Sequence, residues 1–140
     1  MVVSDGAGGA IVAWEQVVTT SDLYAQRLDP NGEIQWPAGA PSETGVVITD
    51  ADGVQTNPRM ISDGAGGAIV AWMDFRDSGY DIYAQRIDAN GVFQWTTDGV
   101  PVINVLTGQT FPAICSDGAG GAFVAWNDYR AANYDIYAQH

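Results

Sequence analysis

Two segments of the 140-residue sequence combine acidic, basic and aromatic side chains at matching spacing. They are MDFRDSGYD (Met73–Asp81) and NDYRAANYD (Asn127–Asp135). In each segment an Asp is followed two residues later by an Arg, and a Tyr-Asp pair closes the segment. An Asp and an Arg at this spacing can form an ion pair that fixes a long loop, worth about 0–1 kcal/mol when exposed. Edged by tyrosines, the same groups can also line a polar recess that binds a glycan or a peptide.

Both interpretations involve the same residues, and the sequence favours the structural ion pair over ligand binding. The candidate ligand-binding residues are Asp74, Arg76, Tyr80, Asp81, Asp128, Arg130, Tyr134 and Asp135. Either acid of a segment could be the partner of its Arg. The first repeat reads EQVVTTSDLYAQ (15–26) and lacks the Asp-x-Arg pattern. Its absence argues against a site to which every repeat must contribute.

Other chemistries lack essential parts in this sequence. The only histidine is His140 and there is no lysine, so we expect no histidine-based triad, metal centre or Walker-type phosphate loop. The turns DPNG (29–32) and DANG (88–91) offer fewer oxygen ligands than an EF-hand loop, which favours a turn-forming role over calcium binding. Paired carboxylates for glycoside hydrolysis remain possible, but turn chemistry explains the repeated acids. We therefore predict no enzyme, no cofactor and no metal.

The composition limits the partners of the protein. Five basic residues against 17 acidic ones give a net charge of −12. Such a surface repels phosphate backbones and anionic lipids, so nucleic-acid binding is not expected. The sequence has no apolar run of 18 residues, so we expect no membrane insertion, and we expect no signal peptide before the first repeat. The one cysteine, Cys115, aligns with Ile61 of the previous repeat and is predicted to be a small buried apolar residue.

Three landmarks recur in step along the chain and define an internal repeat. The stretch SDGAGGA begins at Ser4, Ser62 and Ser116, and the triplet YAQ begins at Tyr24, Tyr83 and Tyr137. The third landmark pairs RLDPNGEIQW (27–36) with RIDANGVFQW (86–95). Length differences between repeats fall in two places, which marks these places as loops. Three landmarks in step indicate tandem copies of one structural unit.

Each unit is expected to contain four short strands. In the second unit these are Arg59–Ser62, Ala68–Asp74, Asp81–Ile87 and Val92–Trp95. Their β-branched and aromatic residues are typical of strands, and no stretch keeps a helical period. Gly-rich DGAGG and Asn-Gly turns provide the tight reversals between them. We expect aromatic side chains to pack between units, namely Trp72, Phe75, Tyr83, Trp95 and their equivalents.

Four antiparallel strands in a repeated unit of this length are typical of a β-propeller blade. The sequence predicts an all-β chain with blade 1 and a long linker at 1–58, blade 2 at 59–112, and blade 3 at 113–140 without its fourth strand. Propellers use about four to eight blades, so either this is a piece of a longer chain or copies associate into a ring. We predict a homo-oligomer formed through exposed blade faces.

The loops of such blades lie on two opposite sides. DGAGG and the Asn-Gly turns are expected on one constant side, and the variable segments 15–22 and 37–58 on the other. Diversity gathered on one side indicates where a partner would bind.

The stretch SDGAGGAIVAWMDFRDSGYDIYAQRIDANG (62–91) resembles tandem repeats of large secreted bacterial proteins, and more distantly TolB-like propeller repeats. The resemblance covers nearly the whole chain and implies an extracellular, periplasmic or cell-surface location. It implies a scaffold or interaction module without catalysis. The alternatives are a lectin-like propeller that binds a carbohydrate or peptide through the candidate residues, and a repeat without any ligand.

Overall fold

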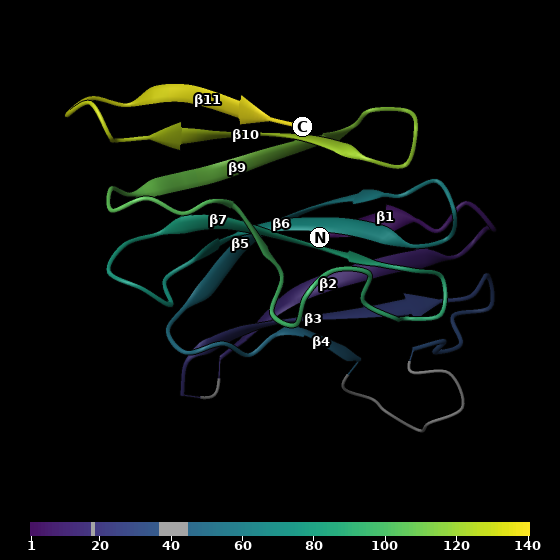
Figure 1. The fold of residues 1–140 in the computed structure, drawn as a ribbon. Coiled ribbons are helices and arrows are strands. Elements are labelled where there is room, and N and C mark those ends of the chain that lie inside the picture. The colour runs from purple at the N-terminus through teal and green to yellow at the C-terminus, as the bar shows by residue number, and fades with distance from the viewer. Residues whose placement is uncertain (18, 37–44) are drawn as a thin grey trace.

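The computed structural model describes residues 1–17, 19–36 and 45–140. These residues form eleven strands and no helix, arranged as three antiparallel sheets (Figure 1). The prediction of an all-β chain is therefore confirmed. No helix within the described ranges has the length and hydropathy of a membrane span.

The three sheets succeed one another along the chain. The first sheet has the order β1 (Val2–Ser4), β2 (Ala10–Val17), β3 (Ser21–Leu28) and β4 (Val46–Thr49). The second has the order β5 (Gln55–Ser62), β6 (Ala68–Asp74), β7 (Asp81–Ile87) and β8 (Val100–Ile103). The third contains β9 (Gln109–Ser116), β10 (Ala122–Asp128) and β11 (Asp135–Gln139). Each sheet is thus one meander, as the repeat predicts.

The fourth strand was predicted at the wrong place. Residues Val92–Trp95 make only one isolated bridge, between Ile87 and Phe93, and β8 pairs with β7 instead. The side chain of Gln85 explains the difference. Its amide nitrogen donates to the carbonyl oxygen of Thr96 at 2.7 Å, and its amide oxygen accepts from the backbone N–H of Trp95 at 3.1 Å. A buried amide therefore replaces a strand ladder at this point.

The first strand of the second sheet is longer than predicted. It begins at Gln55, whereas the expected strand began after Pro58. The pairing of β5 with β6 shifts register between Thr56 and Arg59, and Asn57 has a φ of 54°. Such a β-bulge tolerates proline, because the extra residue of the bulge needs no ladder hydrogen bond.

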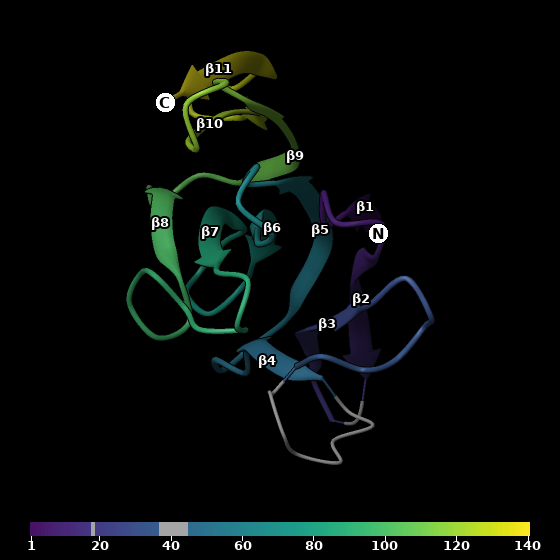
Figure 2. The ribbon, with the colours of Figure 1, turned by 90° about the vertical axis from the view of Figure 1, so that its right-hand side faces the viewer.

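The sheets pack face to face, and side chains between them form two cores. The first core joins the first two sheets and contains Ile11, Leu23 and Trp36 from one side and Met60, Trp72 and Ile87 from the other. The second core joins the second and third sheets and contains Ala71, Met73, Ile82 and Ala84 opposite Val124 and Trp126. Contacts between sheets are concentrated on β5 and β9 (Figure 2).

One expectation about burial holds only in part, and another is wrong. Trp72 and Tyr83 are buried between sheets, as predicted, but Phe75 and Trp95 are exposed. Phe75 lies beyond the end of β6 and packs on Tyr80 instead. Cys115 is also exposed, so the prediction of a buried residue is wrong. It pairs with Phe123 on the outer face of the third sheet, which no other sheet of the described chain covers.

Candidate functional site

The predicted site of the second repeat lies in the loop between β6 and β7. Asp74, the last residue of β6, is fully buried and is the acceptor at the centre of this loop. Its Oδ2 accepts from the indole N–H of Trp72 at 2.8 Å and from Nη2 of Arg76 at 2.6 Å. Its Oδ1 accepts from Nε and from the backbone N–H of Arg76, at 2.8 and 3.0 Å. The ion pair between Asp74 and Arg76 is therefore bidentate, and it closes the turn that follows β6.

The guanidinium of Arg76 makes two further contacts. It stacks 3.9 Å from the ring centre of Tyr83 on the neighbouring strand, and its Nη2 also donates to the carbonyl oxygen of Asp98 at 2.9 Å. Tyr83 in turn stacks on Trp72, with ring centres 6.3 Å apart. With its Nε and Nη2 groups hydrogen-bonded and one π face stacked on a ring, Arg76 fixes the loop to the sheet.

The third repeat builds the same arrangement. Arg130 pairs with buried Asp128 at 2.6 Å, lies 4.1 Å from the ring centre of Tyr137, and Trp126 donates to Asp128 at 3.1 Å. The hydrogen bond from the Arg130 side chain, with those from Trp126 and the Arg130 backbone, holds the pKa of Asp128 well below its usual range. Between the two possible acid partners of each arginine, the structure therefore selects the one before it.

The second acid of the β6–β7 loop has a different role. Asp81 is buried, and its Oδ1 accepts from the backbone N–H of Val105 at 3.1 Å. Burial raises the pKa of Asp81, and the nearby acids Asp77 and Asp74 act in the same direction. Tyr80 packs edge-on against Phe75 with ring centres 5.0 Å apart. Asp81 therefore holds the loop against the segment after β8, whereas Tyr80 packs on a residue of the same loop.

The corresponding residues of the third repeat are open to solvent. Tyr134 and Asp135 are both exposed, and Tyr134 packs on Tyr129 with ring centres 5.1 Å apart. Asp135 accepts a hydrogen bond from the amide of Asn133 at 3.1 Å. The eight candidate residues thus form two separate loop clusters, one per repeat, rather than a shared site.

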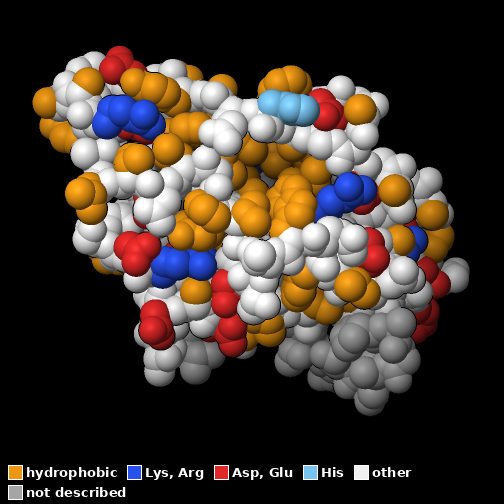
Figure 3. All heavy atoms as spheres, viewed as in Figure 1, with side chains coloured by type: hydrophobic (Ala, Val, Ile, Leu, Met, Phe, Trp, Pro, Cys, Tyr) orange, Lys and Arg blue, Asp and Glu red, His pale blue; other side chains and the backbone are white. Residues whose placement is uncertain are grey.

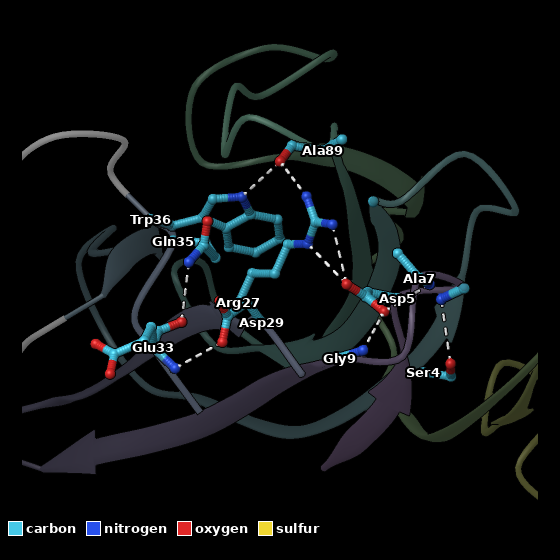
Figure 4. Close-up of polar contacts among 12 residues, drawn as sticks. Ser4, Asp5, Ala7, Gly9, Arg27, Asp29, Glu33, Gln35, Trp36 and Ala89 are labelled. Atoms are coloured by element: carbon cyan, nitrogen blue, oxygen red, sulfur yellow. Dashed lines mark hydrogen bonds and ion pairs between the residues drawn. The ribbon is translucent and has the colours of Figure 1, made fainter. Parts of the chain in front are cut away.

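A second set of ion pairs, which was not predicted from the sequence, lies at the opposite end of the strands. Figure 4 shows the pair of the first repeat, between Asp5 and Arg27. The Asp of each SDGAGGA turn accepts from two backbone N–H groups of its own turn and from the side chain directly after YAQ. Oδ1 of Asp5 accepts from Ala7 and Gly9, each at 2.8 Å, and Oδ2 accepts from Arg27 at 2.9 Å. Asp63 repeats this with Arg86 at 3.0 Å. Each pair ties the first turn of a sheet to its third strand.

The third repeat uses a histidine at this position. His140 Nε2 lies 2.8 Å from Asp117 Oδ2, where the other repeats have an arginine. This hydrogen bond, together with those from the backbone of Ala119 and Gly121, lowers the pKa of Asp117 to about 2. The backbone hydrogen bond from Ala7 is the main cause of a lowered pKa at Asp5. The signal for these pairs was present in the sequence, since Asp, Arg and His recur at nearly constant separation.

One contact joins the turns of neighbouring sheets. The carbonyl oxygen of Ala89 accepts from the indole N–H of Trp36 at 3.0 Å and from Nη1 of Arg27 at 2.9 Å (Figure 4). Gly91 lies over the same indole, since a Cβ there would be 2.9 Å from Cγ of Trp36. The DANG turn (88–91) of the second repeat therefore packs over the segment Gln35–Trp36 of the first repeat.

Metal ligation receives no positive support from the described residues, among which no group of three or more His, Cys, Asp or Glu side chains is placed to hold an ion. Of the two segments expected on the variable side, residue 18 and residues 37–44 lie outside the described ranges. In comparisons with protein-family models, curated proteins and solved structures, nothing matched the chain.

Proposed function

We propose that this chain is a non-enzymatic scaffold or interaction module whose sheets are blades of a β-propeller that copies of the chain complete by association. Three features support the propeller: each sheet is a meander, successive sheets pack face to face, and contacts between sheets concentrate on first strands. The resemblance of the repeat to secreted bacterial repeat proteins supports a secreted or cell-surface setting.

The observation that carries the association is the pair of open faces at the two ends of the stack. Val2 on the first sheet occupies the position of Met60, yet Val2 is 65% exposed and Met60 is 4% exposed. Ile136 on the third sheet occupies the position of Ile82, yet the exposures are 73% and 0%. Each end thus presents the face that its equivalent buries inside the molecule.

The two end faces are complementary in kind. The open face of the first sheet corresponds to the face of the second sheet that packs against the first, and the open face of the third corresponds to the face of the second that packs against the third. A head-to-tail contact between copies would therefore repeat the internal packing, and such contacts close into rings when the rotation allows. Two copies would supply about six blades, within the range of known propellers.

Native mass spectrometry and light scattering of the 140-residue chain test this proposal. We expect a closed oligomer, with a dimer as the simplest form, and we expect Val2→Asp or Ile136→Asp to convert it to a monomer. Val92→Asp is the matched control, because Val92 is exposed beside the turn after β7, which belongs to the middle sheet. A folded monomer at micromolar concentration, or an oligomer that ignores both end-face variants, would contradict the proposal.

A lectin-like function is the second candidate, and one observation favours it. Tyr129 and Tyr134 form an exposed aromatic pair beside the Arg130 loop, a surface on which a sugar ring could stack. A glycan array with the wild-type protein and Tyr134→Ala tests it. Selective binding that is lost in the variant supports the lectin, whereas a folded sample that binds no glycan supports the scaffold.

A further inference from the structure

The two ends of the strands carry different kinds of connection. One end, here called the loop side, carries the loop after β6 (residues 75–80) and the linkers before β5 (residues 50–54) and β9 (residues 104–108). These segments lie at the left of Figure 1, and the SDGAGGA turns lie at the right. In Figure 3, orange and red side chains are interspersed along the left edge of the molecule. Apolar and acidic side chains therefore share the loop side.

The apolar side chains of the loop side come from the middle of the chain. Leu106 is 93% exposed, and Phe75 and Val105 are also exposed. The backbone N–H of Val105 donates to Oδ1 of Asp81 at 3.1 Å, and Tyr80, the residue before Asp81, packs edge-on against Phe75. The linker and the loop are therefore held together, and their apolar side chains form one exposed surface.

This exposure does not come from an uncovered sheet. Phe75 follows the last strand residue of β6 in the middle sheet, which has a core on each face. Leu106 lies three residues before the first residue of β9, and Asp52 lies three residues before the first residue of β5. Asp52 is exposed as well, although its linker joins two sheets that cover each other. The position is therefore open in both linkers, and exposed apolar groups gathered there are typical of a binding surface.

Acidic side chains border the apolar surface on two sides. On one side, Nδ2 of Asn104 lies 3.4 Å from Oδ2 of Asp77, which places this acid beside the linker that contains Leu106. On the other side, the backbone N–H of Phe75 donates to the carbonyl oxygen of Val54 at 2.9 Å, which places the linker with Asp50 and Asp52 beside the loop. All three acids are exposed.

The charge of this surface selects the partner. Arg76 is the only cation in the three segments, and its guanidinium is already paired with Asp74 at 2.6 Å. Within the described ranges, Asp50, Asp52 and Asp77 form no ion pair. A nucleic acid, an acidic protein or a second copy of this chain, with its net charge of −12, is repelled by such a surface. A cationic polypeptide is attracted to it.

We propose that the loop side binds a cationic segment of another protein, one that alternates basic residues with large apolar ones. The apolar side chains of the segment would pack on Leu106 and Phe75, and its basic groups would lie beside Asp52 and Asp77. This inference deepens the interaction-module part of the proposed function by naming the kind of partner. It uses neither of the two end faces.

The probe is the synthetic peptide acetyl-KWKLKWK-amide, which alternates lysine with large apolar residues. It is titrated into the ¹⁵N-labelled 140-residue protein, and amide shifts give the site and the affinity. We expect saturable binding, with shifts concentrated in residues 50–54, 75–80 and 104–108. A peptide with glutamate in place of each lysine should not bind. A peptide with alanine in place of each tryptophan and leucine should bind at least about tenfold more weakly, because it lacks apolar anchors.

Two pairs of variants at exposed positions locate the site. Leu106→Ser should weaken binding of the probe at least about fivefold, because an apolar contact is lost. Val92→Ser is its matched control at the opposite end of the strands, and the affinity there should stay within about twofold of wild type. Asp77→Asn should weaken binding about threefold at low salt and less at high salt. Glu33→Gln, an exposed acid in the turn after β3, is the control for charge and should change little.

Four results would overturn the proposal. These are no saturable binding at millimolar probe, equal binding of the alanine peptide, shifts outside the three segments, and equal effects of a variant and its control. The Val2→Asp variant keeps this test apart from the ring, because its mass reports on the end faces. Its affinity for the probe should stay within about twofold of wild type. A loss of probe binding in that variant would tie the surface to the ring and contradict an independent site.

Discussion

The two cores of this protein are built from the same repeat but are closed to different degrees. Between the first and second sheets, Trp36 is completely buried, and its indole N–H donates to the Ala89 carbonyl oxygen. Between the second and third sheets, Trp95 is 38% exposed and borders a recess of about 360 Å³. The difference arises at the end of the third strand of the neighbouring sheet and in the turn that follows it. Residues Ile87–Gly91 seal the first core, and no described segment takes that place beside the second.

A single repeat therefore does not supply all the residues that close its own core. The Gln-Trp segment of one repeat packs against the Asx-Gly turn of the next. A complete core therefore contains residues of two successive repeats. Repeat proteins gain much of their stability from such interfaces between neighbours. Substitutions at equivalent positions should therefore have unequal effects on stability.

The largest expected effect is at the two tryptophans. Trp36→Ala should lower the free energy of unfolding by about 3–5 kcal/mol, because it empties a fully packed site and removes a hydrogen bond. Trp95→Ala should cost less than half as much, since its indole already contacts solvent. Urea unfolding monitored by far-UV circular dichroism measures both. Equal losses would show that the two cores are equally closed.

The next effect concerns the last glycine of the SDGAGG turn. A Cβ at Gly67 would collide with the carbonyl oxygen of Ile87, which is backbone and cannot move away. At Gly121 the nearest atom is Oδ2 of the Asp117 side chain, at 2.5 Å, which can rotate. Gly67→Ala should therefore cost about 1–3 kcal/mol, and Gly121→Ala clearly less. Thermal unfolding of the two variants makes the comparison, and the reverse order would refute it.

A smaller effect of opposite sign is expected at Asp81. Because burial raises its pKa above the unfolded value of 3.8, protonation favours the folded state, and this contribution is lost as the pH rises through the raised pKa. Asp81→Asn should thus stabilise the protein at about pH 7, because the amide has no charge to bury and can still accept the hydrogen bond from Val105. The gain should disappear below about pH 4. Exposed Asp135 is the matched control, and Asp135→Asn should change neither value.

The smallest effect is the acid dependence of the third repeat. The pKa of Asp117 is lowered to about 2 from 3.8, so its stabilising contribution is present above about pH 4 and is lost as the pH falls from about 4 to about 2. Asp117→Asn should remove that part of the pH dependence of the unfolding midpoint. A variant whose midpoint falls with acid as steeply as wild type would show that the pair with His140 contributes nothing.

Local sequence predicted the strands and turns whose cause is local. β6 and β7 match the predicted strands residue for residue, because β-branched and aromatic residues there are bounded by glycine and Asx turns. The fourth strand was misplaced because Gln85 holds the Trp95 segment by side-chain hydrogen bonds, which no strand pattern reports. The Asp-x-Arg pairs were predicted as a structural network, whereas the choice of Asp74 over Asp81 needed the fold.

The sequence by itself determined the repeat, the all-β class and the position of the tight turns, because these depend on periodic residue types and on glycine at positive φ, as at Gly64 and Gly66. Only the tertiary structure decided which faces are covered, which acid each arginine binds, and how far each tryptophan is buried. These depend on which neighbouring sheet lies against a residue. Trp36 and Trp95 occupy equivalent places in the repeat, and their burial differs because only one of them has a turn packed over it.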